Sequence, residues 1–157
     1  MINQKRLTEE FLELTAIPSL SRQEGPIARR LESILKDMGA SVEVDDAGEK
    51  VGGNTGNILA RFTGTDTDAA PLLLSGHMDT VGPASQVRTV IEGDIIHTDH
   101  TSVLGGDDKA GLVAILEAIR VLRERRLPHG DLEVVITICE ETGLLGAKHF
   151  DTTRLRA

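Results

Sequence analysis

The amino-acid sequence predicts an α/β domain: a central sheet, mostly parallel or mixed, with helices on both faces. Two short apolar runs, residues 72–75 and 132–138, are typical of strands that are buried on both sides. Residues 22–38 and 108–125 carry apolar side chains at helical spacing and predict two amphipathic helices. Strands mixed with helices in this way favour a sheet covered by helices, and 157 residues are enough for one such domain.

Local signals define the first two helices. Apolar residues at helical spacing within residues 7–14 predict a helix that ends before Pro18. Ser21 and Glu24 match the S-x-x-E pattern of a capping box, which predicts the start of the second helix. Gly39 stands where that helix should end in a left-handed residue.

The remaining elements are shorter. Residues 41–46 and 58–62 are predicted as strands, with a glycine-rich loop over residues 48–57 between them. Residues 87–99 are typical of a hairpin that turns at a Gly-Asp pair. Residues 143–150 indicate the start of one more helix.

Composition and charge exclude several classes of partner. A formal net charge of −8, with no Trp or Tyr and three Phe, argues against binding to nucleic acid. The sequence contains no apolar run long enough to cross a bilayer, so we expect no membrane partner. Cys139 is the only cysteine, which fits a reducing compartment. Because the N-terminus is also polar, we expect a cytoplasmic protein.

Carboxylates follow the predicted buried elements. Asp79 comes after one apolar strand, Glu140 and Glu141 come after the other, and Asp107 and Asp108 stand at the start of the long helix. Ligands in α/β sheets bind beyond the carboxyl ends of strands, so these groups are expected to share one cleft. Gathered carboxylates repel one another unless a cation lies between them. Taken singly, they also suit a helix cap or a solvated strand end.

Histidines give two further candidates for metal binding. His77 lies two residues before Asp79, and one imidazole among carboxylates suits zinc, manganese or cobalt better than calcium. A histidine in this position is also common as an ordinary loop or core residue. His97, Asp99 and His100 offer a second small metal site or, alternatively, an exposed hairpin arm.

Three ordered motifs narrow these choices. The segments "SGHMDTV", "GGDDKAG" and "CEETGLLGAK" resemble the co-catalytic zinc exopeptidase family, which includes peptidase T, acetylornithine deacetylase and succinyl-diaminopimelate desuccinylase. The segment "IPSLSRQE" near the N-terminus is also similar to this family. The run "HTDHTSVLGGDDKAG" looks most like the peptidase T branch. The resemblance covers nearly the whole chain.

The resemblance implies a role for each matching residue. His77 and Glu141 would bind zinc, and Asp107 would bridge two metal ions and be followed by a cis peptide bond. Asp79 would not touch the metal but would orient the imidazole of His77 through a hydrogen bond. Glu140 would be the general base that takes a proton from a metal-activated water.

The resemblance also implies a function and a larger protein. We expect a metal-dependent hydrolase of short peptides that uses two zinc ions, with manganese or cobalt as substitutes, and that forms a homodimer when complete. Residues 1–157 would then be the N-terminal part of the catalytic domain, without the inserted dimerisation and lid domain and without the C-terminal part. Two alternatives stay open: an inactive fragment or non-catalytic module of such an enzyme, and a deacylase of N-acyl amino acids. Because ligands for a second zinc are missing, we expect the 157-residue chain to bind at most one metal weakly and to hydrolyse peptides negligibly.

Overall fold

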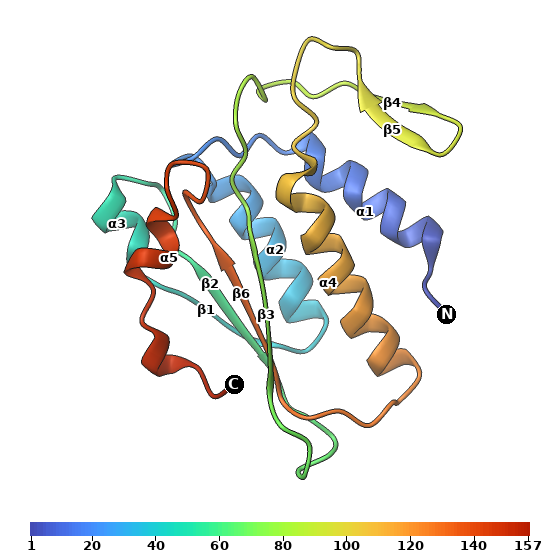
Figure 1. Cartoon of the computed structure of the whole chain (residues 1–157), viewed down its shortest axis with the longest axis vertical. Helices are drawn as coiled ribbons and strands as arrows, with labels where there is room; N and C mark the ends of the chain where they lie inside the picture. Colours follow the sequence, from blue (N-terminus) through green and yellow to red (C-terminus); the bar gives the residue numbers. More distant parts are fainter.

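The computed structural model describes all of residues 1–157. Its elements in chain order are α1 (Gln4–Ala16), α2 (Gly25–Asp37), β1 (Ser41–Val44), α3 (Ala47–Val51), β2 (Ile58–Phe62), β3 (Leu72–His77), β4 (Thr89–Glu92), β5 (Ile95–Thr98), α4 (Gly106–Glu124), β6 (Leu132–Thr137), α5 (Leu145–His149) and a 3₁₀ turn (Thr152–Arg154). The main sheet lies in the middle, and the β4–β5 hairpin projects from one end of it (Figure 1).

Four strands form one mixed sheet in the order β1-β2-β6-β3. The β1–β2 and β2–β6 pairs are antiparallel, whereas β3 runs parallel to β6. The interior position predicted for residues 132–138 is confirmed, since all six residues of β6 are buried. The prediction that residues 72–75 form an inner strand is wrong, because β3 is the edge strand and Leu72 is 53% exposed. An apolar run indicates a strand but does not show how many neighbours that strand has.

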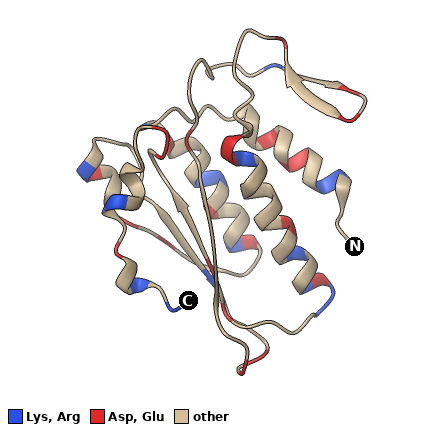
Figure 2. Cartoon of the chain, in the orientation of Figure 1, with Lys and Arg blue, Asp and Glu red and all other residues tan.

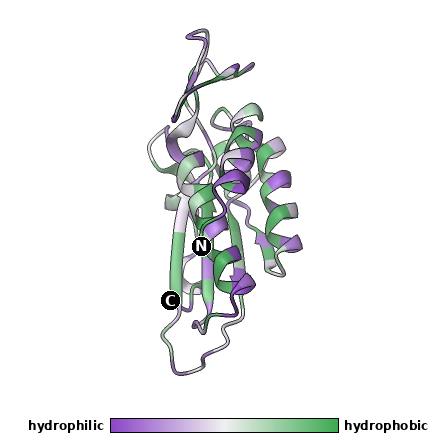
Figure 3. Cartoon of the chain, turned by 90° about the vertical axis from the view of Figure 1, so that its right-hand side faces the viewer, coloured by the Kyte–Doolittle hydropathy of each residue, from purple (hydrophilic) through white to green (hydrophobic).

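The three long helices cover one face of the sheet. Side chains alternate between the two faces of a strand, so every second residue of β2 and β6 points toward α1, α2 and α4. The side view coloured by hydropathy shows apolar residues on both the strands and the helices (Figure 3). The core formed there includes Leu14, Ile27, Leu31, Leu35, Ile58, Phe62, Leu112, Leu116, Val134 and Ile136.

The C-terminal part of the chain lies against the opposite face. Glu133 points away from the helical core, pairs with Arg61, and accepts backbone hydrogen bonds from Arg156 at 2.7 Å and Ala157 at 3.0 Å. In Figure 1 this segment and the short α5 lie at the left of the strands. The predicted α/β class, with a mixed sheet flanked by helices, is confirmed.

Several local predictions can now be assessed. The hairpin is confirmed, and its turn residue Gly93 has a φ of +60°. The prediction of a loop over residues 48–57 is wrong at its start, because residues 48–51 belong to the short α3. The capping box is wrong: Glu24 occupies the N-cap position of α2, but its side chain makes no capping hydrogen bond. None of the helices combines the length and apolar character needed to cross a bilayer.

Candidate active site

The predicted site residues come from three separate elements: the C-terminal ends of β3 and β6 and the N-terminal start of α4. His77 is the last residue of β3 and lies in register with Thr137 at the end of β6, so Glu140 and Glu141 follow just beyond it. The start of α4 brings Asp107 to the same place. Acidic residues at the start of α4 and in the loop after β6 lie near one another in Figure 2.

Three of these side chains form a group suited to one ion. One ligand atom each from His77, Asp107 and Glu141 lies within 4.8 Å of the other two. His77 is buried, whereas the Asp107 side chain is 83% exposed, so the group opens toward solvent on one side. No other group of three or more His, Cys, Asp or Glu side chains in the structure approaches this closely.

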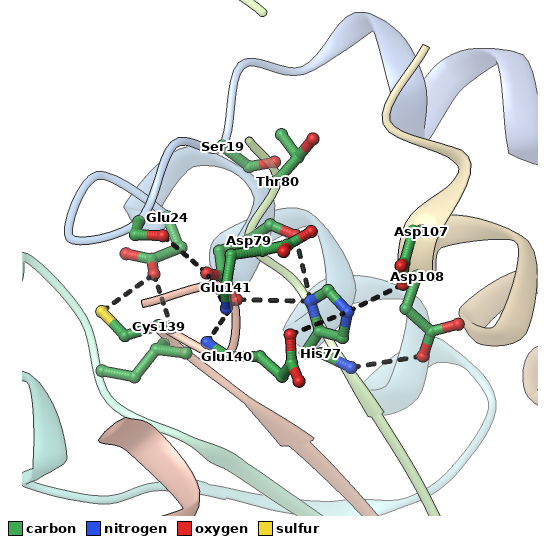
Figure 4. A network of polar contacts seen from close by, with 12 residues as sticks. Ser19, Glu24, His77, Asp79, Thr80, Asp107, Asp108, Cys139, Glu140 and Glu141 are labelled. Atoms are coloured by element: carbon green, nitrogen blue, oxygen red, sulfur yellow. Dashed lines mark hydrogen bonds and ion pairs between the residues drawn. The ribbon is translucent and has the colours of Figure 1, made fainter. Parts of the chain in front are cut away.

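The imidazole of His77 is fixed from both of its nitrogens. Nδ1 lies 3.0 Å from the backbone oxygen of Asp79 and 3.3 Å from its carboxylate, while Nε2 lies 3.0 Å from Oδ1 of Asp107 (Figure 4). Burial favours the neutral ring, but the hydrogen bonds with Asp79 and Asp107 outweigh it and raise the pKa of His77 to about 9. Nε2 is therefore the nitrogen that faces the group of ligands.

Asp79 is fully buried and connects β3 to the loop after β6. Its carboxylate accepts hydrogen bonds from the hydroxyl of Ser21 at 2.7 Å and from the backbone N–H groups of Glu140 at 2.9 Å and Glu141 at 3.2 Å. Burial works to raise the pKa of Asp79, but these hydrogen bonds and His77 lower it overall. Asp79 thus contacts both the imidazole of His77 and the backbone of the two glutamates.

The start of α4 has an irregular backbone that shapes the site. The predicted cis peptide bond between Asp107 and Asp108 is present. The carboxylate of Asp108 lies between two glycines: a Cβ atom on Gly111 would approach Oδ1 to 2.1 Å, and one on Gly76 would approach Oδ2 to 2.6 Å. Only residues without a side chain leave room for Asp108 there.

The charges of the group fit a bound cation. Burial raises the pKa of Glu141, and repulsion from Asp107 adds to this effect. The raised pKa of His77 has a related cause, because a proton on the ring balances the surrounding carboxylates. A divalent ion would balance the same charges, and both imidazole nitrogen and carboxylate oxygen are donors that zinc accepts in proteins.

Four residues near the site were not predicted as part of it. The buried Lys109 donates a 2.8 Å hydrogen bond to Ser19, and burial lowers its pKa to about 8 against the attraction of Asp79. Ser21 binds Asp79, and Glu24 binds Cys139. The motifs "IPSLSRQE" and "GGDDKAG" contain all four, but local patterns do not reveal contacts made across the fold.

The structure supports neither a second metal site in the hairpin nor a cysteine nucleophile. His97 and His100 stack on one another with ring centroids 6.0 Å apart, and they form no metal-binding group with Asp99. Cys139 is buried, and burial raises the pKa of its thiol to about 11, with the Glu24 carboxylate acting in the same direction. A thiol in this state is a poor nucleophile.

Comparison with known proteins identifies the family. The family model described as peptidase family M28 matches residues 57–156. The chain belongs to peptidase family M28. Within this M28 chain, 57 residues are 51% identical to peptidase T of Escherichia coli K12 and cover 14% of that protein. The resemblance to peptidase T seen in the motifs is thus confirmed.

Longer relatives match the M28 chain from end to end. The uncharacterised protein YqjE of Bacillus subtilis is 44% identical over 100% of the chain, which spans 42% of that relative. The crystal structure of aminopeptidase PepT from Bacillus cereus is 40% identical over 99% of the chain, with a TM-score of 0.97, and the chain covers 42% of it. A tripeptidase from Staphylococcus aureus is 39% identical with a TM-score of 0.95, and again 42% of it is covered. The chain therefore belongs to an enzyme family, and the relatives with which it shares about 40% identity include an aminopeptidase and a tripeptidase.

Proposed function

We propose that this chain carries catalytic residues of a metal-dependent, peptidase T-like exopeptidase that hydrolyses short peptides. The observation that carries the proposal is the group formed by His77, Asp107 and Glu141, with ligand atoms within 4.8 Å of one another and with Glu140 beside them. The similarity to an aminopeptidase and a tripeptidase over the whole chain supports a peptide as substrate.

His77, Asp107 and Glu141 would hold the metal. Their nitrogen and oxygen donors suit zinc, with manganese or cobalt as substitutes. We propose two zinc ions in the complete enzyme, with Asp107 shared between them. When bound, such an ion polarises the scissile carbonyl and lowers the pKa of a water molecule.

Glu140 acts in this proposal as the general base. Its side chain is 34% exposed, and Oε2 lies 3.7 Å from Nε2 of His77, so it borders the open side of the group. It accepts a proton from the attacking water and then donates it to the leaving amine nitrogen. The hydrogen bond from its backbone N–H to Asp79 limits how far this carboxylate can move.

The length of the relatives bears on what the chain does alone. The chain spans 42% of the Bacillus subtilis relative, and we propose that residues 1–157 are the N-terminal part of the catalytic domain of a longer, homodimeric protein. A second candidate function is a non-catalytic module of such an enzyme. The observation on its side is that the structure contains only one metal-binding group.

The proposal is tested by assaying the product of the complete gene for hydrolysis of tripeptides and of N-acyl amino acids, with zinc, manganese or cobalt added. We expect tripeptide turnover that requires metal and falls by about 100-fold or more in Glu140→Ala, since general bases contribute this much. The exposed Glu49→Ala on α3 is the control and should leave turnover unchanged. Turnover of N-acyl amino acids alone would favour a deacylase, and turnover unaffected by Glu140→Ala would refute the role of Glu140.

A further inference from the structure

Cys139 connects β6 to Glu140 in an unusual backbone conformation. Its φ is +52°, in the left-handed region that residues with a side chain rarely adopt, and the residue is fully buried. This conformation turns the chain at the end of the strand so that the next two residues face the site. Since it is unfavourable in isolation, surrounding contacts must stabilise it.

Glu24 provides the contact that faces Cys139. Its Oε1 accepts a hydrogen bond from the backbone N–H of Cys139 at 3.0 Å and lies 3.4 Å from the thiol (Figure 4). Glu24 is fully buried and does not cap α2, and the N–H of Gly25 is bound by Asn54 instead. A buried carboxylate is costly unless it is used, and the local helix does not use this one.

Glu24 and Asp79 together bind three consecutive backbone N–H groups. Glu24 accepts from Cys139, and Asp79 accepts from Glu140 and Glu141. Both carboxylates are fully buried, so their positions are set by the packing of the domain. Loss of either acceptor leaves a buried N–H without its partner and frees the turn to change conformation.

We propose that Glu24 is a positioning residue, which acts through Cys139 to hold Glu140 and Glu141 in the orientation required for proton transfer and metal binding. The inference rests on the proposed function, because it assigns those roles to the two glutamates. Residues that orient metal ligands typically change metal affinity or activity by about 10- to 100-fold when they are replaced, and we expect an effect of this size.

Two replacements separate acceptance of the hydrogen bond from the filling of space. Glu24→Met keeps the length of the side chain but removes the acceptor. In Glu24→Gln the amide oxygen can take the place of Oε1 and keep the hydrogen bond. The NH₂ group then takes the place of Oε2, which makes no hydrogen bond. The control is Glu117→Met, which removes another buried carboxylate, one that binds Asn3 and Arg6 between α1 and α4.

Three measurements are made on each variant: amide hydrogen exchange of residues 139–141, the zinc dissociation constant, and kcat and KM of the complete gene product. In Glu24→Met we expect faster exchange at Cys139, zinc binding weakened about 10-fold or more, and kcat lowered by a similar factor with KM within about twofold. Glu24→Gln should restore zinc affinity and kcat to within about threefold of the unmodified protein. Glu117→Met should lower the melting temperature without altering the exchange of residues 139–141 or zinc binding.

Equal melting-temperature losses in Glu24→Met and Glu117→Met, with exchange of residues 139–141 and zinc affinity unchanged in both, would overturn the proposal. If Glu24→Met does not fold, Glu24→Asp replaces it. Its side chain is one methylene shorter, so the carboxylate lies farther from the N–H of Cys139, and the same measurements apply. A gene product that binds zinc but hydrolyses no peptide would refute the proposed function alone, because exchange and zinc affinity still test the role of Glu24.

Discussion

Oδ1 of Asp79 accepts a 2.9 Å hydrogen bond from the backbone N–H of Glu140, so a residue two positions after the end of β3 contacts the loop that follows β6. The same carboxylate lies 3.3 Å from Nδ1 of His77. One buried side chain thereby sets the relative positions of a candidate metal ligand and a candidate base. The side chain of Asp79 thus links the segments that follow the parallel strands β3 and β6.

Replacement of Asp79 by asparagine tests this relationship. An amide group offers one acceptor oxygen, and its NH₂ group would face N–H and O–H donors from Ser21, Glu140 and Glu141. We expect a loss of about 1–3 kcal/mol in the free energy of unfolding and metal affinity weakened about 10- to 100-fold. Chemical denaturation and metal titration measure the two effects. Asp131→Asn, where the carboxylate binds the N–H of Gly64, is the control for stability. Metal affinity unchanged in Asp79→Asn would contradict the expectation.

Gly111→Ala tests the space occupied by Asp108. In an unconstrained helix alanine is more favourable than glycine by about 1 kcal/mol. Here the new Cβ would lie 2.1 Å from Oδ1 of Asp108, so the carboxylate must move. We expect lower stability and weaker metal binding, measured by thermal unfolding with and without zinc. At Gly106, in the same helix, a Cβ would meet nothing closer than 3.9 Å, so Gly106→Ala should be tolerated far better. Similar behaviour of the two variants would show that the space around Asp108 is unimportant.

The contacts of Glu133, which lies outside the candidate site, predict that stability changes with pH. Burial works to raise its pKa, but the N–H groups of Arg156 and Ala157 and the side chain of Arg61 lower it overall from the ordinary value of 4.5. Its contribution to stability is therefore complete above pH 4.5 and is lost as the pH falls below that value. We expect Glu133→Gln to cost about 1–3 kcal/mol at pH 7 and progressively less below pH 4.5. Urea unfolding at a series of pH values measures this, and a constant difference across the series would argue against it.

The 157-residue chain alone is expected to bind at most one zinc ion per molecule, and weakly. His77, Asp107 and Glu141 supply three ligands, about enough for one catalytic-type site. Equilibrium dialysis followed by metal analysis gives the stoichiometry. We also expect negligible tripeptide hydrolysis by the isolated chain, since positioning of the substrate accounts for several orders of magnitude in rate. Two tightly bound ions, or turnover that Glu140→Ala abolishes, would show that these residues suffice by themselves.

Much of the fold and the core of the site could be predicted because their signals are local. The apolar run of β6, the helical periodicity of α2 and α4, and the position of His77 and Asp79 around the end of a strand are all visible within a few residues. The short α3 was missed because five residues are too few to show helical periodicity. The edge position of β3 depends on which strands pair, and no pattern within the strand encodes that.

Ser21 and Glu24 show the limit of local interpretation most clearly. Their spacing matches a capping box, yet Ser21 donates to Asp79, and Glu24 binds Cys139. Serine and glutamate suit a helix start and a distant turn equally well, because a hydroxyl can donate or accept a hydrogen bond and a carboxylate can accept one in either place. Only the packing of α2 against the sheet decides between the two.

The contacts that shape the site also bear on the order in which the chain folds. Glu24 and Cys139 are separated by 115 residues in the sequence, Ser19 and Lys109 by 90, and Asp79 and Glu140 by 61. Closing loops of this length costs entropy that is recovered only when most of the domain has already packed. The helices and the β4–β5 hairpin can form early from contacts between near neighbours, whereas the turn that carries Glu140 and Glu141 becomes ordered late. We therefore expect metal affinity to appear in refolding experiments only in the final kinetic phase.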